Sequence, residues 1–129
     1  MSDMDDIVRE FVEEGNEKVN QLEHHLIDLE KNPASRELLT EVFRALHTIK
    51  GATSFLGFTK LCSLAHTGES LLARMRDGAL VTNQEISSAL LSLVDAIREI
   101  LAQIAATGKE GDTDYAALIT TLSRLQKAA

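Results

Sequence analysis

A histidine and a lysine three residues apart, His47 and Lys50, are the side chains in this sequence best placed to do chemistry. They lie in a long amphipathic run over residues 38–56, whose apolar stripe is centred between Val42 and Leu46. At about 100° per residue, His47 points roughly 120° from that centre, which puts it at the edge of the buried face. An imidazole at such an edge meets solvent and can serve as a nucleophile.

Neighbours of His47 on the same helical face predict what this nucleophile attacks. Lys50, Gly51 and Ser54 share one patch of surface with His47, because residues three, four and seven positions apart align on a helix. A lysine there supplies positive charge to the oxygens of an incoming phosphoryl group. Gly51 removes side-chain bulk, so that another protein can approach closely. We therefore expect Gly51, Ser54 and Arg44 to contact a partner, although a merely solvated role for Arg44 is an open alternative.

A second polar pair, His66 and Glu69, lies on the next amphipathic run. The link between the two runs is only a few residues long, which favours adjacent antiparallel helices. His47 lies nine residues before Leu56 and Glu69 lies eight residues after Leu61, so both fall at nearly the same height. Glu69 can then accept a hydrogen bond from Nδ1 of His47, which fixes the tautomer and leaves a lone pair on Nε2. His66, one turn before Glu69, either supports the same site or is ordinary surface.

Apolar residues at spacings of three and four predict an all-α protein. Pro33 ends the first helix, Ser35 and Thr59 are suitable N-caps, Gly57 is a suitable terminator, and residues 82–85 (TNQE) form a capping-box pattern. Short links favour an up-down antiparallel four-helix bundle, with a fifth, shorter C-terminal helix packed alongside. We expect a single domain over residues 1–129. Its helices are expected at about 4–31, 36–56, 60–77, 83–106 and 113–127.

Charge and composition exclude several classes of function. The net charge of −7 argues against nucleic acid as a partner, and all of the excess lies in residues 1–31, which hold ten acidic and three basic side chains. No apolar run approaches the roughly 18 residues of a membrane span. Cys62 is the only cysteine, so no intramolecular disulfide is possible. These features predict a cytoplasmic protein without membrane insertion.

The sequence resembles a known family, the histidine-containing phosphotransfer (HPt) domains. The resemblance is carried by HTIKG at residues 47–51, Gly57 and LAHTGESLL at residues 64–72, and it extends over most of the chain. Within the family it is greatest to the N-terminal phosphotransfer domains of chemotaxis sensor histidine kinases.

The resemblance implies a place in a two-component phosphorelay. His47 would accept a phosphoryl group on Nε2 from ATP, delivered by a separate kinase catalytic domain, and pass it to an aspartate of a response-regulator receiver domain. Lys50, His66 and Glu69 would take supporting roles. ATP and Mg²⁺ would be bound by those partner domains, with no cofactor in this chain. The domain would be the substrate part of a histidine kinase, and monomeric when isolated.

Other classes of function fit the sequence less well. A di-iron bundle needs Glu-x-x-His pairs, and none of the four histidines has a glutamate three residues before it, so we expect no metal site. Neither G-x-x-x-x-G-K-[ST] nor G-x-G-x-x-G occurs, which argues against a self-contained ATP-using enzyme. The serious alternative is a helical adaptor whose histidine is not phosphorylated.

Overall fold

The computed structural model describes residues 3–127, with side chains from residue 5. Within that range the chain is helical and contains no strand, as the sequence predicted. Its five helices are α1 (Asp3–Lys31), α2 (Arg36–Leu56), α3 (Thr59–Arg76), α4 (Gln84–Thr107) and α5 (Ala116–Lys127).

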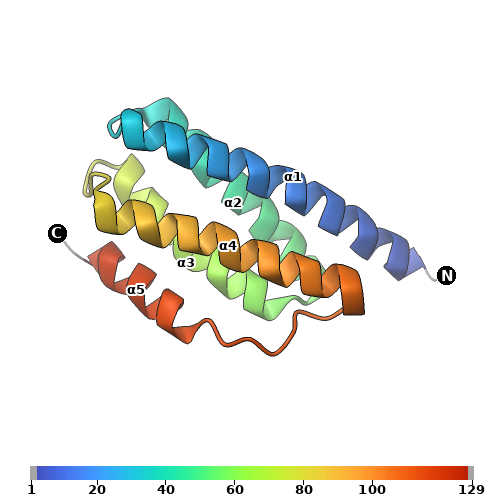
Figure 1. The fold of residues 1–129 in the computed structure, drawn as a ribbon. Helices are drawn as coiled ribbons and strands as arrows, with labels where there is room; N and C mark the ends of the chain where they lie inside the picture. Colours follow the sequence, from blue (N-terminus) through green and yellow to red (C-terminus); the bar gives the residue numbers. More distant parts are fainter. Residues whose placement is uncertain (1–2, 128–129) are drawn as a thin grey trace.

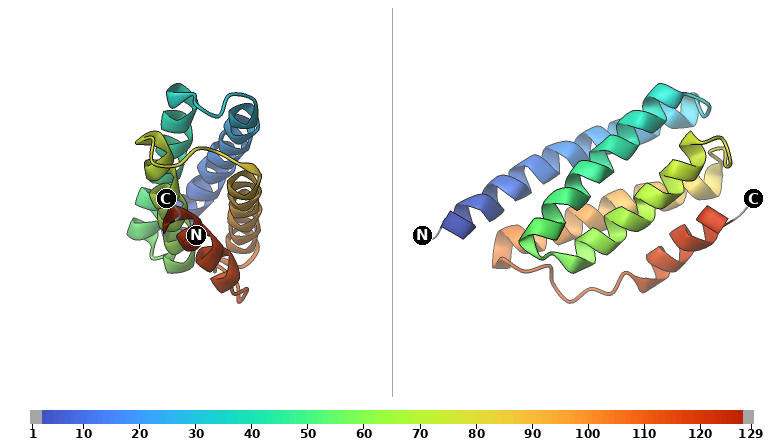
Figure 2. Two further views of the ribbon diagram at one scale, coloured as in Figure 1. Left: turned by 90° about the vertical axis from the view of Figure 1, so that its left-hand side faces the viewer. Right: turned by 180° about the vertical axis from the view of Figure 1, so that it is seen from behind.

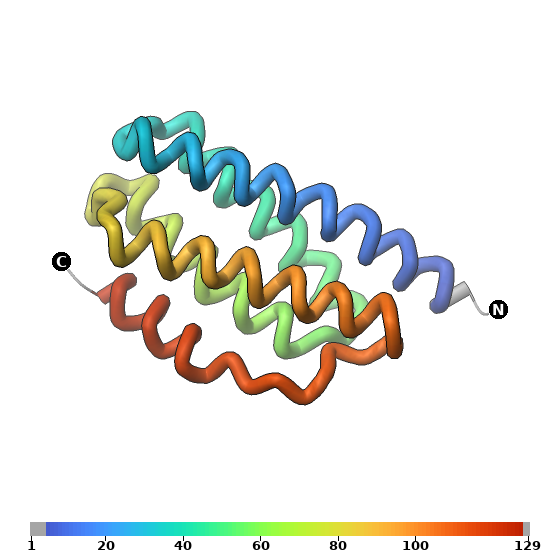
Figure 3. The backbone as a smooth tube through the Cα atoms, viewed as in Figure 1, coloured from blue at the N-terminus to red at the C-terminus, as the bar shows by residue number. Residues whose placement is uncertain are grey.

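The first four helices run up and down as an antiparallel bundle, and α5 lies along its outside (Figures 1 and 2). Helix α2 packs between α1 and α3, α1 also packs on α4, and α5 contacts α3 and α4. The tube view shows the short links at the two ends of the bundle and the longer segment that carries the chain from α4 to α5 (Figure 3). The predicted four-helix bundle with a fifth helix alongside is thus confirmed.

One aliphatic core joins all five helices. Its largest fully buried side chains are all leucines and isoleucines, which have large apolar areas and are compatible with helices. They are Leu22, Leu29, Leu46, Leu61, Leu64, Leu71, Leu72, Leu90, Leu93, Ile97, Ile100 and Leu101. The exposed residues of α2 and α3 lie between these buried positions and leave a polar side free to carry a site.

The ends of α2 are built as the sequence predicts. The Ser35 side chain accepts a hydrogen bond of 3.2 Å from the Leu38 amide, which caps the first turn. Gly57 ends the helix with φ of 80°, a left-handed conformation that suits glycine, and its amide donates to the Thr53 carbonyl. The turn that follows brings α3 back antiparallel to α2.

Four predicted helix starts differ from the observed ones, and three of these, at α1, α3 and α4, differ by one residue. Helix α3 begins at Thr59 itself, and its N-cap residue, Phe58, makes no side-chain cap. Helix α4 is capped by Asn83, whose side chain accepts from the Ile86 amide at 2.8 Å, so the predicted cap at Thr82 was wrong by one residue. An amide oxygen replaced the threonine hydroxyl, and both types are good caps.

The largest displacement is at α5, which begins at Ala116 and not near residue 113. The Asp114 carboxylate accepts from the Ala116 amide at 2.8 Å, and an aspartate that bonds the backbone two residues on favours a turn over a helix. Residues 108–115 consequently form an extended linker. That linker passes the start of α3, where Glu110 accepts hydrogen bonds from the Lys60 and Leu61 amides.

Candidate functional site

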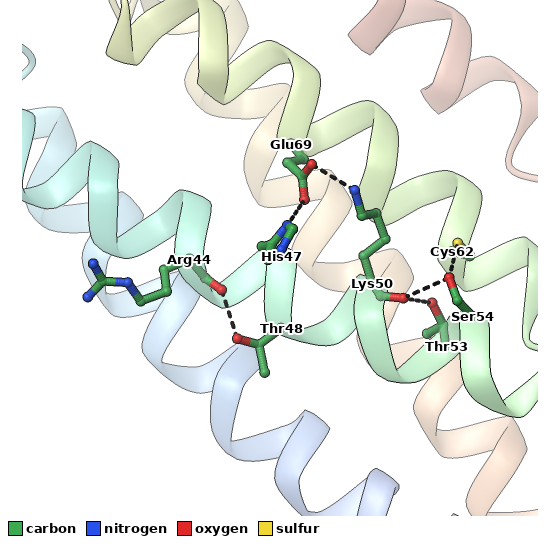
Figure 4. Close-up of polar contacts among 8 residues, drawn as sticks. All are labelled: Arg44, His47, Thr48, Lys50, Thr53, Ser54, Cys62 and Glu69. Atoms are coloured by element: carbon green, nitrogen blue, oxygen red, sulfur yellow. Dashed lines mark hydrogen bonds and ion pairs between the residues drawn. The ribbon is translucent and has the colours of Figure 1, made fainter.

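The candidate site lies on the groove between α2 and α3, the two helices joined by the shortest turn (Figure 4). Gly68 of α3 faces the core, and a Cβ atom built on it would clash with Leu93 of α4 and come within 3.1 Å of Leu46 Cδ1 of α2. The missing side chain therefore lets α3 settle close to both neighbours. This close approach carries the next residue, Glu69, towards the polar edge of α2.

Glu69 links the two predicted residues of α2. One carboxylate oxygen, Oε2, lies 3.0 Å from Nδ1 of His47, and the other, Oε1, accepts a hydrogen bond of 2.8 Å from Nζ of Lys50. The contact confirms the predicted register between α2 and α3. Both carboxylate oxygens are thereby occupied by groups from the facing helix (Figure 4).

The three side chains differ strongly in exposure. The His47 side chain is 64% exposed, whereas Glu69 is 12% and Lys50 is 23% exposed. The ring that we predicted to be a nucleophile is therefore open to solvent, and the residues that hold it are covered. The low exposure of Glu69 was not predicted from the sequence.

Electrostatics fix the protonation of this cluster. Burial raises the pKa of the Glu69 carboxyl, but the hydrogen bonds from Lys50 and His47 outweigh burial, so the pKa of Glu69 lies below its usual value. An ionised carboxylate only accepts hydrogen bonds, so Nδ1 of a neutral His47 must carry the proton. The lone pair of the ring is then on Nε2, the atom that no side chain of the described part of the protein binds.

Two residues near the ring were missed by the sequence argument. The ring of Phe43 is parallel to the His47 ring within 9°, with centroids 6.1 Å apart, and the Arg76 guanidinium carbon lies 4.3 Å from the Phe43 centroid. Phe43 was not predicted to belong to the site. The available signal was its position one turn before His47, where side chains of a helix meet.

The remaining predicted residues surround the cluster without joining it. Gly51 is exposed, and a Cβ on it would meet no atom within 4 Å. The Ser54 hydroxyl donates to the Lys50 carbonyl at 3.3 Å, and Arg44 forms an exposed ion pair of 3.3 Å with Glu41. His66 is exposed, and no hydrogen bond within residues 3–127 connects it to the cluster.

No helix among residues 3–127 is both long enough and apolar enough to cross a membrane.

The model of a known protein family matches this chain. The family model for the Hpt domain matches residues 6–107, which are most of the chain. The chain therefore belongs to the Hpt domain family, the histidine phosphotransfer modules.

Curated proteins similar to this chain include chemotaxis proteins and a sensor histidine kinase. The chain is 39% identical to the chemotaxis protein CheA of Halobacterium salinarum over 105 residues, which cover 81% of this chain and 16% of that protein. It is 36% identical to the sensor histidine kinase CheAY of Helicobacter pylori over 110 residues, covering 85% of this chain and 14% of that protein. The chain thus spans about a sixth of the length of the curated relatives it matches.

Solved structures of CheA domains have the same fold. The CheA phosphotransferase domain from Thermotoga maritima superimposes with a TM-score of 0.77 at 34% identity, covering 81% of this chain and 99% of that one. The phosphorylated P1 domain of CheA3 in complex with CheY6 from R. sphaeroides gives 0.85 at 28% identity, covering 97% of this chain and 99% of that one. The chain is therefore a chemotaxis-type phosphotransfer domain in sequence as well as in fold.

Proposed function

We propose that His47 is the phosphorylated residue of this domain. Nε2 of His47 takes the γ-phosphoryl group of ATP held by a histidine kinase catalytic domain and gives it to an aspartate of a response-regulator receiver domain in chemotaxis signalling. The observation that carries the proposal is the 3.0 Å contact between Nδ1 of His47 and Glu69, which leaves the solvent-facing nitrogen with its lone pair.

The loading step forms one bond and breaks one bond. The Nε2 lone pair attacks the γ-phosphorus, the bond between phosphorus and the bridging oxygen breaks, and ADP leaves with that electron pair. The imidazole becomes positively charged while its proton stays on Nδ1, facing the Glu69 carboxylate. Because that carboxylate is already ionised and fixed in position, it stabilises the charge as it develops.

The unloading step reverses the roles of the atoms. A carboxylate oxygen of the receiver aspartate attacks the phosphorus, the bond between phosphorus and Nε2 breaks, and the ring recovers its lone pair and its neutral state. Nothing in this chain has to be reset, because the proton on Nδ1 has not moved. The domain can therefore be loaded by one partner and unloaded by another.

Supporting roles follow from position. Lys50 orients Glu69 and places positive charge one turn from His47. Gly51, Ser54 and Arg44 lie on the exposed side of α2, where a partner that reaches Nε2 has to land. His66 is one turn from Glu69, and its part in the site rests on family resemblance alone.

Partners of the relatives support the assignment of partner classes. The R. sphaeroides structure contains a phosphorylated CheA3 P1 domain bound to CheY6. By analogy, we infer that a receiver domain of the CheY type visits His47, and that a CheA-type kinase core supplies ATP and Mg²⁺. We further infer that residues 1–129 act as one module in the cytoplasm, where ATP is available.

Radiolabelled ATP and the catalytic core of a CheA-type kinase test the proposal. Wild-type domain should take up label that is labile to acid and stable to base, and His47→Gln should take up none. His24→Gln is the matched control, since His24 is an exposed histidine of α1. Label that persists on His47→Gln, or no label on wild type with an active core, would overturn the proposal and favour a passive adaptor.

A further inference from the structure

We propose that Phe43, held by Arg76, positions the His47 ring so that Nε2 points out of the groove between α2 and α3. This inference rests on the proposed function of His47. In this role neither residue touches the phosphoryl group. Phe43 acts through the histidine, and Arg76 acts through Phe43.

One hydrogen bond is not enough to orient an exposed ring. Within residues 3–127, Glu69 is the hydrogen-bond partner of His47, and it holds a single ring atom, Nδ1. A ring held by its covalent bond at Cγ and by one hydrogen bond at Nδ1 can still tilt about the line through these two atoms, and a tilt displaces Nε2 on the far side of the ring. The 64% exposed side chain has little packing of its own to prevent such a tilt.

Phe43 supplies the missing constraint. Its ring lies one turn before His47 on α2 and is parallel to the imidazole within 9° at a centroid separation of 6.1 Å, inside the range of favourable offset stacking. Phe43 is itself partly buried against the core, so it is a fixed surface and not a mobile one. The stacked ring sets the plane of the imidazole, and Glu69 sets its rotation within that plane.

Arg76 in turn holds Phe43. Its guanidinium carbon lies 4.3 Å from the Phe43 centroid, which is the geometry of a cation–π contact. Arg76 is the last residue of α3, two turns after Glu69, so the antiparallel packing that pairs Glu69 with His47 pairs Arg76 with Phe43. The same two helices therefore fix both constraints on the ring.

Four variants separate this role from docking and from folding. Phe43→Leu removes the flat aromatic face but keeps apolar volume. Arg76→Gln removes the cation, whereas Arg76→Lys keeps a cation that also binds ring faces. The fourth variant combines Phe43→Leu with Arg76→Gln. Phosphoramidate serves as donor, because it needs no partner protein: Nε2 attacks phosphorus and ammonia leaves. Labelling by ATP and a CheA-type kinase core is measured in parallel, and thermal melts confirm that each variant is folded.

We expect Phe43→Leu to slow phosphorylation roughly three- to tenfold and Arg76→Gln roughly two- to fourfold, because misorienting a nucleophile costs rate. Arg76→Lys should regain most of the loss. The double variant should be no slower than Phe43→Leu, since Arg76 acts through Phe43. In Arg76→Gln, the NMR chemical shifts of the His47 ring protons should change, because the stacking between Phe43 and His47 is weakened.

Matched controls are Phe55→Leu, on an exposed ring of the same helix, and Arg124→Gln, on an exposed arginine of α5. Both should react at the wild-type rate. Wild-type rates in Phe43→Leu, additive losses in the double variant, or rate loss in Arg76→Gln without a change at the His47 ring would each overturn the positioning role. A wild-type domain that neither donor can label would instead contradict the proposed function itself.

Discussion

Gly68 and Leu93 lie so close together that α3 can carry only a hydrogen at that position. A Cβ on Gly68 would clash with Cδ2 of Leu93, which is itself buried in the core and has little freedom to move. Glu69 follows directly in the sequence, so the close packing of α3 against α4 at Gly68 determines how near the carboxylate comes to His47. Packing far from the exposed ring therefore sets the geometry of the site.

Replacing this glycine should destabilise the protein. Gly68→Ala gains about 1 kcal/mol of helix propensity but overpacks the core at a cost of about 1–3 kcal/mol, so we expect a net loss of about 1 kcal/mol. Gly51→Ala is the control, because open space surrounds Gly51 and only the propensity gain applies. In urea titrations the free energy of unfolding should fall for Gly68→Ala and rise for Gly51→Ala. Equal changes in the two variants would contradict the packing argument.

Acid should weaken the fold through Glu69. The pKa of Glu69 is lowered in the folded state, so its contribution to stability is present above the unfolded pKa of about 4.3 and is lost as pH falls through the lower folded pKa. The free energy of unfolding of wild type should therefore fall more steeply between about pH 5 and pH 3 than that of Glu69→Gln. Parallel curves for the two proteins would mean that the carboxylate gains nothing from Lys50 and His47.

Removing the charge of Glu69 should slow phosphorylation. In Glu69→Gln the side chain can still accept a hydrogen bond from Nδ1, but it no longer stabilises the positively charged ring. We therefore expect a phosphorylation rate of roughly one tenth of the wild-type rate or below. The initial rate of label uptake from the kinase core measures this, and a melting curve confirms folding. A rate within twofold of wild type would show that Nε2 is reactive without the carboxylate.

His66 should matter less than Glu69. His66 is exposed and is not hydrogen-bonded to the cluster within residues 3–127, so His66→Gln should be phosphorylated more slowly than wild type but faster than Glu69→Gln. The same label-uptake assay ranks the three proteins. A loss as large as that of Glu69→Gln would place His66 in contact with the reacting group.

The start of α3 should depend on a distant carboxylate. Glu110 accepts hydrogen bonds from the Lys60 and Leu61 amides at 3.2 and 2.6 Å, and Phe58 offers no cap of its own. Glu110→Ala should cost about 1 kcal/mol, as loss of an N-cap does. Asp112→Asn in the same linker, with an exposed side chain, should be neutral in the same urea titration. Equal stability of both variants with wild type would contradict trans capping.

Local patterns were enough to predict the fold and the central pair of the site. The stripes of α1 to α4 and the short turn after α2 determine an antiparallel register, and that register alone brings Glu69 to His47. The N-cap at Ser35 and the terminator at Gly57 were also predictable, because each acts within one turn of its own helix.

Features that depend on contacts between distant segments were not predictable. The Glu110 cap joins residues about fifty positions apart, and the Arg76 contact with Phe43 requires the exact rotation of two helices. The predicted start of α5 was wrong because Tyr115 fits the apolar pattern of the helix, whereas Asp114 favours a local turn. Burial of Glu69 follows from Gly68, whose role appears only once α4 is in place.

The acidic face of α1 has a consequence for which donors can reach His47. Exposed carboxylates of Glu10, Glu13, Glu14 and Glu17 lie on the helix next to α2, and Glu14 and Glu17 share a groove with Thr48. The field of these groups repels free polyanions over distances of about a Debye length. We therefore expect free nucleotide, which is a polyanion, to be disfavoured relative to nucleotide delivered by a complementary protein surface. We expect charge repulsion to slow phosphorylation by free nucleotide, and added salt should weaken that effect.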